Sequence, residues 1–414
     1  MDPALRAVVS PMSRFATALS LLVVACLSPL AHAQPVLKIE YRVKVDDHPM
    51  LTYGPMELAS PVLTPDGQFA VVAAQGGRLH LLQTRDGSAV YTRTLPGGVS
   101  AAPALEGDLI LLGTEEGTVH LLKLAHGTDV WAEPANVRGA VRSTPVLWRN
   151  QTVFVQDDKS VITALSAKDG STLYTFDEES FAARGLSPFT IFSYPAPLAT
   201  SDALYAGFET GQLVKFLLTT KSGQVLPEFE TAWSAPLCDP NSRPVPTDGR
   251  PPVCSPRRFF TAADTSPVLT PAGLVGGCFC NGLFMLDPET GKSIWQQQIR
   301  GPSSPLRVGD FFYLTSADGA AYSIEVDSGE VLWTTQLDIS IVSRPALLGH
   351  PQSPDSSVLA VATGKQLYFL DLVTGKLLDR LKSVNGFCAA PASAGNTFFV
   401  LSNEGYLYRM VYFR

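Results

Sequence analysis

Short segments with a two-residue alternation of apolar and polar side chains recur along the whole chain. Residues 108–112 (DLILL) are almost entirely apolar, and residues 118–124 (TVHLLKL) largely alternate. A period of two places successive side chains on opposite faces of a β-strand. Gly117 stands between the two segments, and glycine readily adopts the positive φ that a tight hairpin turn requires. These residues therefore predict a β-hairpin.

The hairpin belongs to a repeat that fits the chain eight times. Each copy starts at a proline, has in four of the eight copies a glycine fourteen residues later, and continues through a second glycine to a position that is usually aromatic. Four short strands per period of about forty residues are typical of a β-propeller. We therefore predict an all-β fold, an eight-bladed β-propeller that occupies residues 34–414 as one domain. The eight prolines are Pro61, Pro103, Pro145, Pro197, Pro267, Pro305, Pro345 and Pro391.

Individual copies depart from this repeat at identifiable positions. Lys159 and Asn281 replace the first glycine in the third and fifth copies, and Pro227 and Asp379 replace the aromatic residue in the fourth and seventh. A large ring on an outer strand can cover the seam between neighbouring blades and bury about 150–250 Å². We therefore assign the aromatic residues to packing. They are Tyr91, Trp131, Tyr174, Trp295 and Trp333.

The last repeat copy supplies only three strands before Arg414. One further predicted strand, near the N-terminus, belongs to none of the eight copies. Residues 37–43 (LKIEYRV) precede the first repeat proline and have the pattern of the missing strand, with Tyr41 at the aromatic position. Closing the ring removes the exposed sheet edges that an open array of blades would carry. We therefore predict that this N-terminal strand completes the eighth blade and closes the ring.

Residues 1–33 have the organisation of an export signal peptide. Arg6 and Arg14 form a positive region, residues 15–27 are apolar but too short to span a bilayer, and Ala31-His-Ala33 is a small-x-small cleavage site. An alternative is lipidation at Cys26, because residues 23–26 (VVAC) resemble a degenerate lipobox. Both alternatives predict a periplasmic or otherwise extracytoplasmic protein. The second adds an outer-membrane lipid anchor.

Five cysteines follow the signal. Cys238 and Cys254 flank a proline-rich loop, and an oxidising compartment favours a disulfide between them. Cys278 and Cys280 lie in a predicted turn, where a structural disulfide, turn packing, a redox pair and a soft-metal site are the alternatives. Cys388 precedes the last repeat proline.

Charge and histidine spacing exclude several functions. The formal net charge is −7 and no run of Lys and Arg exceeds two residues, which argues against nucleic acid as a partner. The histidines are dispersed, without a partner at metal-ligand spacing, and His80 and His120 occupy equivalent repeat positions. We therefore predict a packing role for both.

Residues 286–295 (LDPETGKSIW), preceded by Pro267, resemble the repeat of pyrroloquinoline-quinone (PQQ) type propellers, in which Leu-Asp, Thr-Gly-Lys and Trp follow a strand. The resemblance extends over about residues 35–414. It implies a quinoprotein-like fold but not one function, because dehydrogenases and cofactor-free proteins share the repeat. Among the latter, the chain resembles the BamB family of outer-membrane assembly lipoproteins in size, in blade number and in Cys26.

The resemblance to quinoprotein dehydrogenases would imply PQQ held against a disulfide between adjacent cysteines, with calcium bound by carboxylate and amide groups. No two cysteines are consecutive in this chain, and Cys278 and Cys280 come nearest. No positions match the calcium ligands or the catalytic aspartate. We therefore assign no catalytic, cofactor-binding or metal-binding residue.

The longest insertions are expected to emerge on one face, because the turn after the second strand and the crossover to the next blade share a face of the propeller. They are residues 176–193, residues 228–263 and the Cys278–Cys280 turn. Within the second insertion, Arg257, Arg258, Phe259 and Phe260 combine cations with aromatic rings, as interface hot spots do. We predict a protein interface there. The alternative is that the two phenylalanines begin the next blade.

Two functions of different class follow. We favour an exported, non-enzymatic scaffold that binds protein partners, with a BamB-like role in outer-membrane protein assembly. It would bind no cofactor and no nucleic acid, and would touch a membrane only through a lipid anchor. The alternative is a PQQ-dependent, calcium-containing quinoprotein dehydrogenase.

Overall fold

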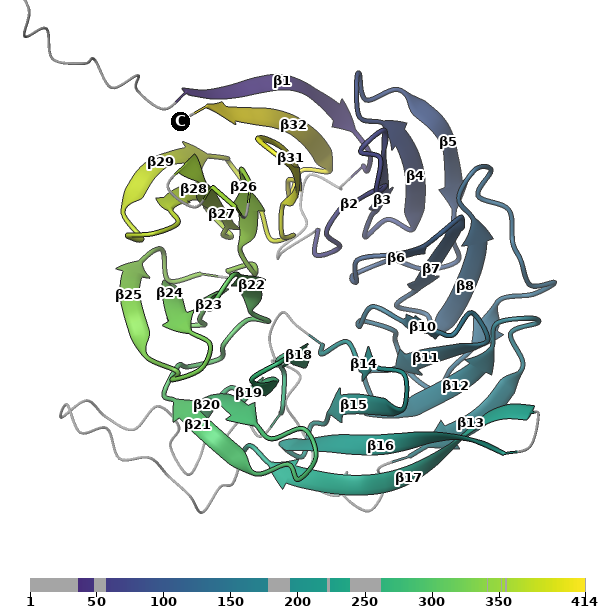
Figure 1. Cartoon of the computed structure of the whole chain (residues 1–414). Helices are drawn as coiled ribbons and strands as arrows, with labels where there is room; N and C mark the ends of the chain where they lie inside the picture. Colours follow the sequence, from purple (N-terminus) through teal and green to yellow (C-terminus); the bar gives the residue numbers. More distant parts are fainter. Residues whose placement is uncertain are drawn as a thin grey trace, which may run out of the picture.

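Eight four-stranded antiparallel sheets surround a central axis in the computed structural model (Figure 1). The structure describes residues 36–47, 57–177, 194–221, 224–238, 262–340, 342–350, 352–353 and 356–413. Within these ranges, no helix is long and apolar enough to pass through a bilayer. The arrangement confirms the predicted all-β, eight-bladed propeller.

Each of the first seven sheets uses four consecutive strands, ordered from the axis outward. The first four sheets consist of β2 (Val62–Leu63), β3 (Phe69–Ala73), β4 (Arg78–Gln83), β5 (Ala89–Thr94); β6 (Ala104–Glu106), β7 (Leu109–Gly113), β8 (Thr118–Lys123), β9 (Ala135–Asn136); β10 (Val146–Trp148), β11 (Thr152–Gln156), β12 (Ile162–Ser166), β13 (Thr172–Phe176); and β14 (Leu198–Ala199), β15 (Ala203–Gly207), β16 (Gln212–Lys221), β17 (Gln224–Pro236). The next three consist of β18 (Val268–Thr270), β19 (Gly273–Cys278), β20 (Gly282–Leu286), β21 (Ser293–Gln297); β22 (Leu306–Val308), β23 (Phe311–Thr315), β24 (Ala320–Glu325), β25 (Val331–Gln336); and β26 (Ala346–Leu348), β27 (Val358–Ala362), β28 (Gln366–Asp371), β29 (Leu377–Lys382).

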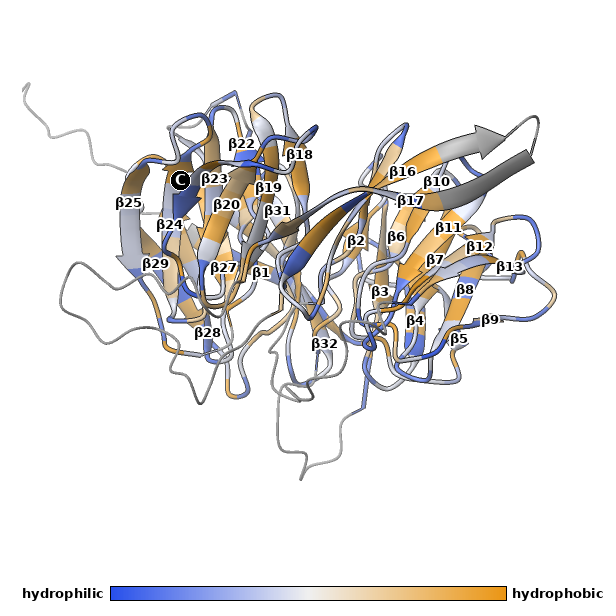
Figure 2. Cartoon of the chain, turned by 90° about the horizontal axis from the view of Figure 1, so that it is seen from below, coloured by the Kyte–Doolittle hydropathy of each residue, from blue (hydrophilic) through white to orange (hydrophobic). Residues whose placement is uncertain are grey.

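The core lies between neighbouring blades rather than at one centre. The second strand of a blade is apolar on both faces because both faces are covered, and in β7 four of five residues are buried. Val71 of the first blade and Leu112 of the second belong to one buried cluster. Outer strands alternate between half-buried and exposed residues, as β25 does. Apolar segments accordingly follow the inner strands of the blades (Figure 2).

Glycines occupy the tight turns, as the repeat predicts, but two positions were misaligned. Gly117 has φ of 76°. In the third and fifth blades the left-handed residue is Ser160, with φ of 60°, and Gly282, with φ of 94°, one residue after the predicted Lys159 and Asn281. These two blades have one residue more between the repeat proline and the turn than the second blade has, so counting fourteen residues from the proline stops one residue early. The left-handed turn itself is retained, even where a residue with a side chain must adopt it.

Aromatic rings seal the seams between blades, which confirms their predicted packing role. Trp131 lies on the turn glycine of the next blade, where a Cβ added at Gly170 would be 2.9 Å from the indole. Its Nε1 donates to the carbonyl of Ala167 at 3.0 Å. The same pair of contacts recurs for Trp295 on Gly329 and Val326, and for Trp333 on Gly375 and Leu372.

The fourth blade does have an aromatic residue at its seam, although the repeat count places Pro227 at that position. Trp233, not Pro227, covers Gly291 of the fifth blade and donates from Nε1 to the carbonyl of Pro288 at 3.1 Å. The β16–β17 hairpin is longer than its counterparts, and Lys215 pairs with Trp233 in its register. The prediction was wrong because counting from the glycine ignores this extension.

The ring closes between the two ends of the described chain, as predicted. The eighth sheet contains β30 (Ala392–Ala394), β31 (Thr397–Leu401), β32 (Tyr406–Phe413) and, outermost, β1 (Val36–Lys44). β1 pairs antiparallel with β32, with Val43 opposite Leu407 (Figure 1). Tyr41 covers Gly87 of the first blade and donates its hydroxyl to the carbonyl of Thr84 at 2.9 Å. The N-terminal strand thus joins the last blade and also seals it to the first.

A pair of buried carboxyl groups lies beside this closure. Asp46 is 2% exposed and Glu57 is 0% exposed. Asp46 accepts a hydrogen bond from the backbone N–H of Gly76 at 2.6 Å, and Glu57 accepts one from Gln75 at 3.1 Å. Burial, aided by the neighbouring Asp46 carboxylate, raises the pKa of Glu57 to about 8. Glu57 is therefore protonated in the folded protein near neutral pH.

We expect Glu57 to make stability fall as pH rises from about 4.5 to about 8. Over this window the unfolded chain releases the Glu57 proton while the folded protein keeps it, so unfolding becomes more favourable by about 1.4 kcal/mol per pH unit at most. Glu57→Gln keeps a neutral side chain and should remove this slope. Denaturant titration at pH 5 and pH 8 measures it.

The matched control is Glu106→Gln on the protein surface, which should leave the pH slope of the parent unchanged. If Glu57→Gln and the parent lose the same free energy of unfolding between pH 5 and pH 8, Glu57 is already ionised in the folded state and this account of the closure is wrong.

Candidate functional site

A cavity of about 540 Å³ lies at the axis of the propeller. Residues from five consecutive blades line it. So many blades approach one another only near the axis of the ring. They come from crossovers between blades and from turns between second and third strands. Those two kinds of connection share one face, so the cavity opens where the sequence predicts the insertions to gather. Its lining consists of Leu58, Ser60, Asp264, Phe279, Arg300, Gly301, Pro302, Ser303, Ser304, Thr315, Ser316, Ala317, Ile339, Ser340, Val342, Ser343, Arg344, Cys388 and Ala390.

The residue before each repeat proline contributes to a belt around the axis. Seven blades have a small residue at this position, and the seventh blade has Arg344. Side-chain hydrogen bonds join belt positions of different blades. They are Ala390 N–H to Ser60 Oγ at 3.0 Å, Thr144 Oγ1 to the Ala102 carbonyl at 2.9 Å, Ala196 N–H to Ser266 Oγ at 2.9 Å, and Ser266 N–H to Ser304 Oγ at 3.0 Å.

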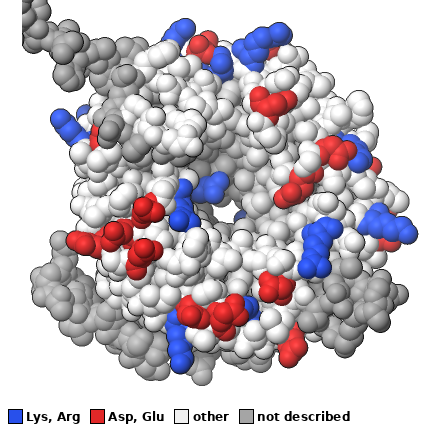
Figure 3. Space-filling model, viewed as in Figure 1, with Lys and Arg blue, Asp and Glu red and all other residues white. Residues whose placement is uncertain are grey.

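Two cations lie in the cavity. Arg344 is exposed to it, yet the protein around the cavity removes solvent from the guanidinium and lowers its pKa. Arg300 lies with its guanidinium carbon 5.1 Å from the centre of the Phe279 ring, a cation–π distance. Among the described residues, neither arginine has an ion-pair partner. Lys and Arg side chains border the central hollow in the space-filling view (Figure 3).

A carboxyl group also lines this cavity and connects it with a smaller one. Asp264 lines both the large cavity and a small one of about 30 Å³ that Asp157 and Glu209 also line. Burial raises the pKa of Asp264 to about 7, and burial also raises the pKa of Asp157 and of Glu209. Asp157 accepts backbone N–H groups of Gly139, Lys159 and Val161, so its role is to hold a turn.

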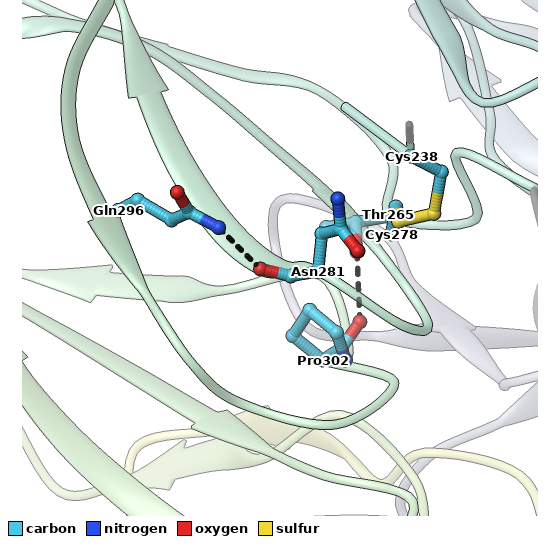
Figure 4. The surroundings of a disulfide bond; sticks show 6 residues. All are labelled: Cys238, Thr265, Cys278, Asn281, Gln296 and Pro302. Carbon is cyan, nitrogen blue, oxygen red and sulfur yellow. Dashed lines mark hydrogen bonds between the residues drawn. A yellow bond between two sulfur atoms is a disulfide. The ribbon is translucent and has the colours of Figure 1, made fainter. Parts of the chain in front are cut away.

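A disulfide joins the fourth and fifth blades near the cavity. Cys238, just after β17, bonds to Cys278 at the end of β19, with 5.9 Å between their Cα atoms (Figure 4). The predicted pairing of Cys238 with Cys254 is therefore wrong, because Cys238 contacts the next blade across the seam and not the far end of its own loop. Cys254 lies outside the described residues.

The same bond removes two interpretations of the Cys278–Cys280 turn. Cys278 is bonded to Cys238, and Cys280 is disulfide-bonded as well, so the two are neither a mutual redox pair nor free thiolates for a soft metal. Cys388 is a free, buried cysteine. Near the disulfide, Thr265 donates to the carbonyl of Pro302 at 2.8 Å, which ties the fifth blade's crossover to the sixth's (Figure 4).

Several predicted site residues lie outside the described part of the chain. They are Arg257, Arg258, Phe259, Phe260 and Cys26, and their roles stay predictions. The structure instead brings together Arg300, Arg344 and Asp264, which the sequence analysis missed. Arg344 had a signal in the sequence, since it is the single large residue before a repeat proline.

The described ranges contain no candidate metal-binding cluster. Their His, Cys, Asp and Glu side chains include no group of three or more that could hold a metal ion. His80 donates from Nε2 to the carbonyl of Val45 at 2.7 Å, its Nδ1 is hydrogen-bonded to the Thr92 hydroxyl at 2.9 Å, and burial lowers the pKa of its imidazole. The residues also do not fit PQQ, because Cys278 is bonded across blades and forms no disulfide between adjacent cysteines.

Comparison with known proteins gives the following. Residues 42–146, 77–254 and 230–348 match the family described as outer membrane protein assembly factor BamB, in overlapping segments. The outer membrane protein assembly factor BamB of Burkholderia pseudomallei is 26% identical over 390 residues, which are 92% of this chain and 90% of that protein. The BamB of Escherichia coli is 22% identical over 360 residues, 84% of this chain and 83% of that protein.

Solved structures agree in fold. The crystal structure of BamB from Moraxella catarrhalis superposes with a TM-score of 0.69 at 14% identity, covering 91% of this chain and 100% of that one. A quinohemoprotein alcohol dehydrogenase from Comamonas testosteroni superposes with a TM-score of 0.66 at 13% identity, covering 91% of this chain and 76% of that one. At such identities these likenesses describe the propeller alone.

Proposed function

This chain belongs to the family of the outer membrane protein assembly factor BamB, and we propose that it is a non-enzymatic scaffold in the assembly of outer-membrane proteins. The observation that carries the proposal is the family match, which extends over residues 42–348. Its partners would be proteins, in the first place components of the outer-membrane assembly machinery.

The geometry supports a scaffold. The propeller is closed by β1 and its seams are sealed by aromatic side chains, so that only the outermost strand of each blade is an outer sheet edge and the surface loops are held in defined positions. One face carries the crossovers, the inter-blade disulfide and the axial cavity. A rigid platform with one elaborated face suits the binding of another protein, whereas the described residues offer no set of groups for quinone chemistry.

The location that we propose is the periplasmic side of the outer membrane. It rests on the family and on the predicted signal peptide over residues 1–33. Cleavage after Ala33 would release the chain into the periplasm, and lipidation of Cys26 would anchor it to the membrane.

Affinity capture from native membranes tests the proposal. A tagged copy of the full chain should recover a component of the outer-membrane assembly machinery, identified by mass spectrometry. Arg258→Glu should reduce that recovery at least several-fold if residues 257–260 form the interface. Arg85→Glu is the matched control, because this exposed arginine lies in a turn between third and fourth strands, on the face away from the axial cavity.

Capture that repeatedly returns no assembly component would contradict the scaffold function. Recovery that is equal for the parent and Arg258→Glu would retain the function and reject the proposed interface. Calorimetric titration with PQQ distinguishes the alternative function, since saturable one-to-one binding that requires calcium would favour a quinoprotein.

A further inference from the structure

The axial cavity is rich in hydrogen-bond donors that the protein itself leaves unused. The guanidinium groups of Arg300 and Arg344 have no ion-pair partner within the described part of the chain, although the protein as a whole carries a net charge of −7. A cation that is partly desolvated and unpaired is costly to a fold, and an anionic ligand would offset that cost.

Three serine hydroxyls add neutral donors to the same cavity. Ser60, Ser303 and Ser304 each accept a backbone N–H through Oγ, from Ala390, Thr315 and Ser266 respectively, at 3.0 Å. Each of these oxygens is thereby held in place while its own O–H proton has no acceptor among the described residues. The cavity thus presents fixed O–H donors beside the two cations.

Arg344 departs from the repeat in a way that packing does not explain. The seven equivalent belt positions hold serine, threonine or alanine, and these small residues suffice to close the belt. The arginine side chain makes no hydrogen bond within the described residues, so it contributes no bond to the blade. A guanidinium at this position extends the reach of the seventh blade into the cavity, where it can form paired hydrogen bonds with a carboxylate.

From these contacts we infer that the axial cavity binds a carboxylate-bearing, acidic peptide segment, with Arg344 and Arg300 as its anchors and the serine hydroxyls as additional donors. A volume of about 540 Å³ is in the range of ligand pockets. Leu58, Phe279 and Ile339 add apolar surface that suits peptide side chains better than a bare inorganic anion. The peptide class rests on the proposed function, whereas the anion site rests on the cavity alone.

Fluorescence anisotropy with the purified protein tests this site. The probe is a fluorescein-labelled heptapeptide that alternates glutamate and aspartate, and its control is the same peptide with glutamine and asparagine. We expect saturable binding of the acidic peptide, at least tenfold weaker binding of the amide peptide, and an affinity that falls as salt increases. Arg344→Ser, which restores the residue type of the other blades, should weaken acidic-peptide binding at least tenfold.

Arg85→Ser is the control variant and should change the affinity less than twofold. Arg300→Ser provides a second variant with the same expected loss, should Arg344→Ser change the melting temperature. Equal affinity of Arg344→Ser and the parent, or of the acidic and amide peptides, would overturn the site. Displacement of the peptide by an equal concentration of inorganic phosphate would overturn the peptide assignment. None of these results depends on capture from membranes, so the scaffold function and this site fail separately.

Discussion

Deletion of residues 35–45 is expected to abolish the cooperative unfolding of the propeller. The deletion removes β1 and thereby its antiparallel pairing with β32 from Val36–Phe413 to Lys44–Tyr406. It also removes Tyr41 from the seam on Gly87. β32 would become an exposed edge, and the eighth blade would no longer be sealed to the first. Thermal unfolding followed by circular dichroism should change from one sharp transition to a broad one at lower temperature.

Lys38→Ala is the control for this deletion, because Lys38 lies in β1 with an exposed side chain and its loss leaves the strand paired. This variant should melt as the parent does. A truncated protein that retains the sharp transition at the parental temperature would show that ring closure by β1 is dispensable.

Replacing Trp131 by alanine is expected to cost about 3–5 kcal/mol of unfolding free energy, the usual range for a buried tryptophan. Trp131 is 3% exposed, lies against Gly170 of the third blade and donates to the Ala167 carbonyl. Alanine would leave a void along the seam and would remove the hydrogen bond to the Ala167 carbonyl. Denaturant titration followed by circular dichroism measures the loss without relying on tryptophan fluorescence.

Trp131→Phe separates the two contributions, since phenylalanine fills most of the seam but cannot donate a hydrogen bond. The phenylalanine variant should lose clearly less unfolding free energy than the alanine variant. Leu332→Ala on the outer strand β25 is the surface control, because Leu332 is 50% exposed. A Trp131→Ala protein within about 1 kcal/mol of the parent would mean that the ring fills the seam without stabilising it.

Residue spacing in the repeat predicted most of the aromatic residues at the seams but not the one in the fourth blade. Trp131, Trp295 and Trp333 follow their turn glycines at a constant distance, and all three lie on the next blade as predicted. Pro227 stands at the same distance in the fourth copy, but the longer β16–β17 hairpin brings Trp233 to the seam instead. Spacing predicts a contact only while the hairpin keeps its length, because register is determined by cross-strand pairing.

The cysteines show a different limit. A loop flanked by Cys238 and Cys254 suggested a local bond, yet Cys238 lies next to Cys278 of the following blade, 40 residues away. A disulfide requires Cα atoms within about 7 Å, and sequence proximity does not provide this distance when a crossover directs the chain toward its neighbour. Only the packing of adjacent blades selects the partner.

The strands, their grouping into eight blades, the closing strand and the seam rings other than Trp233 could be predicted from the sequence, because each depends on local period, turn glycines and contacts between consecutive repeats. Only the tertiary structure shows that Cys238 bonds to Cys278 and that Arg300, Arg344 and Asp264 line one cavity at the axis. Residues of five blades meet there because the ring closes. That closure brings together positions whose distance along the chain carries no information about their distance in space.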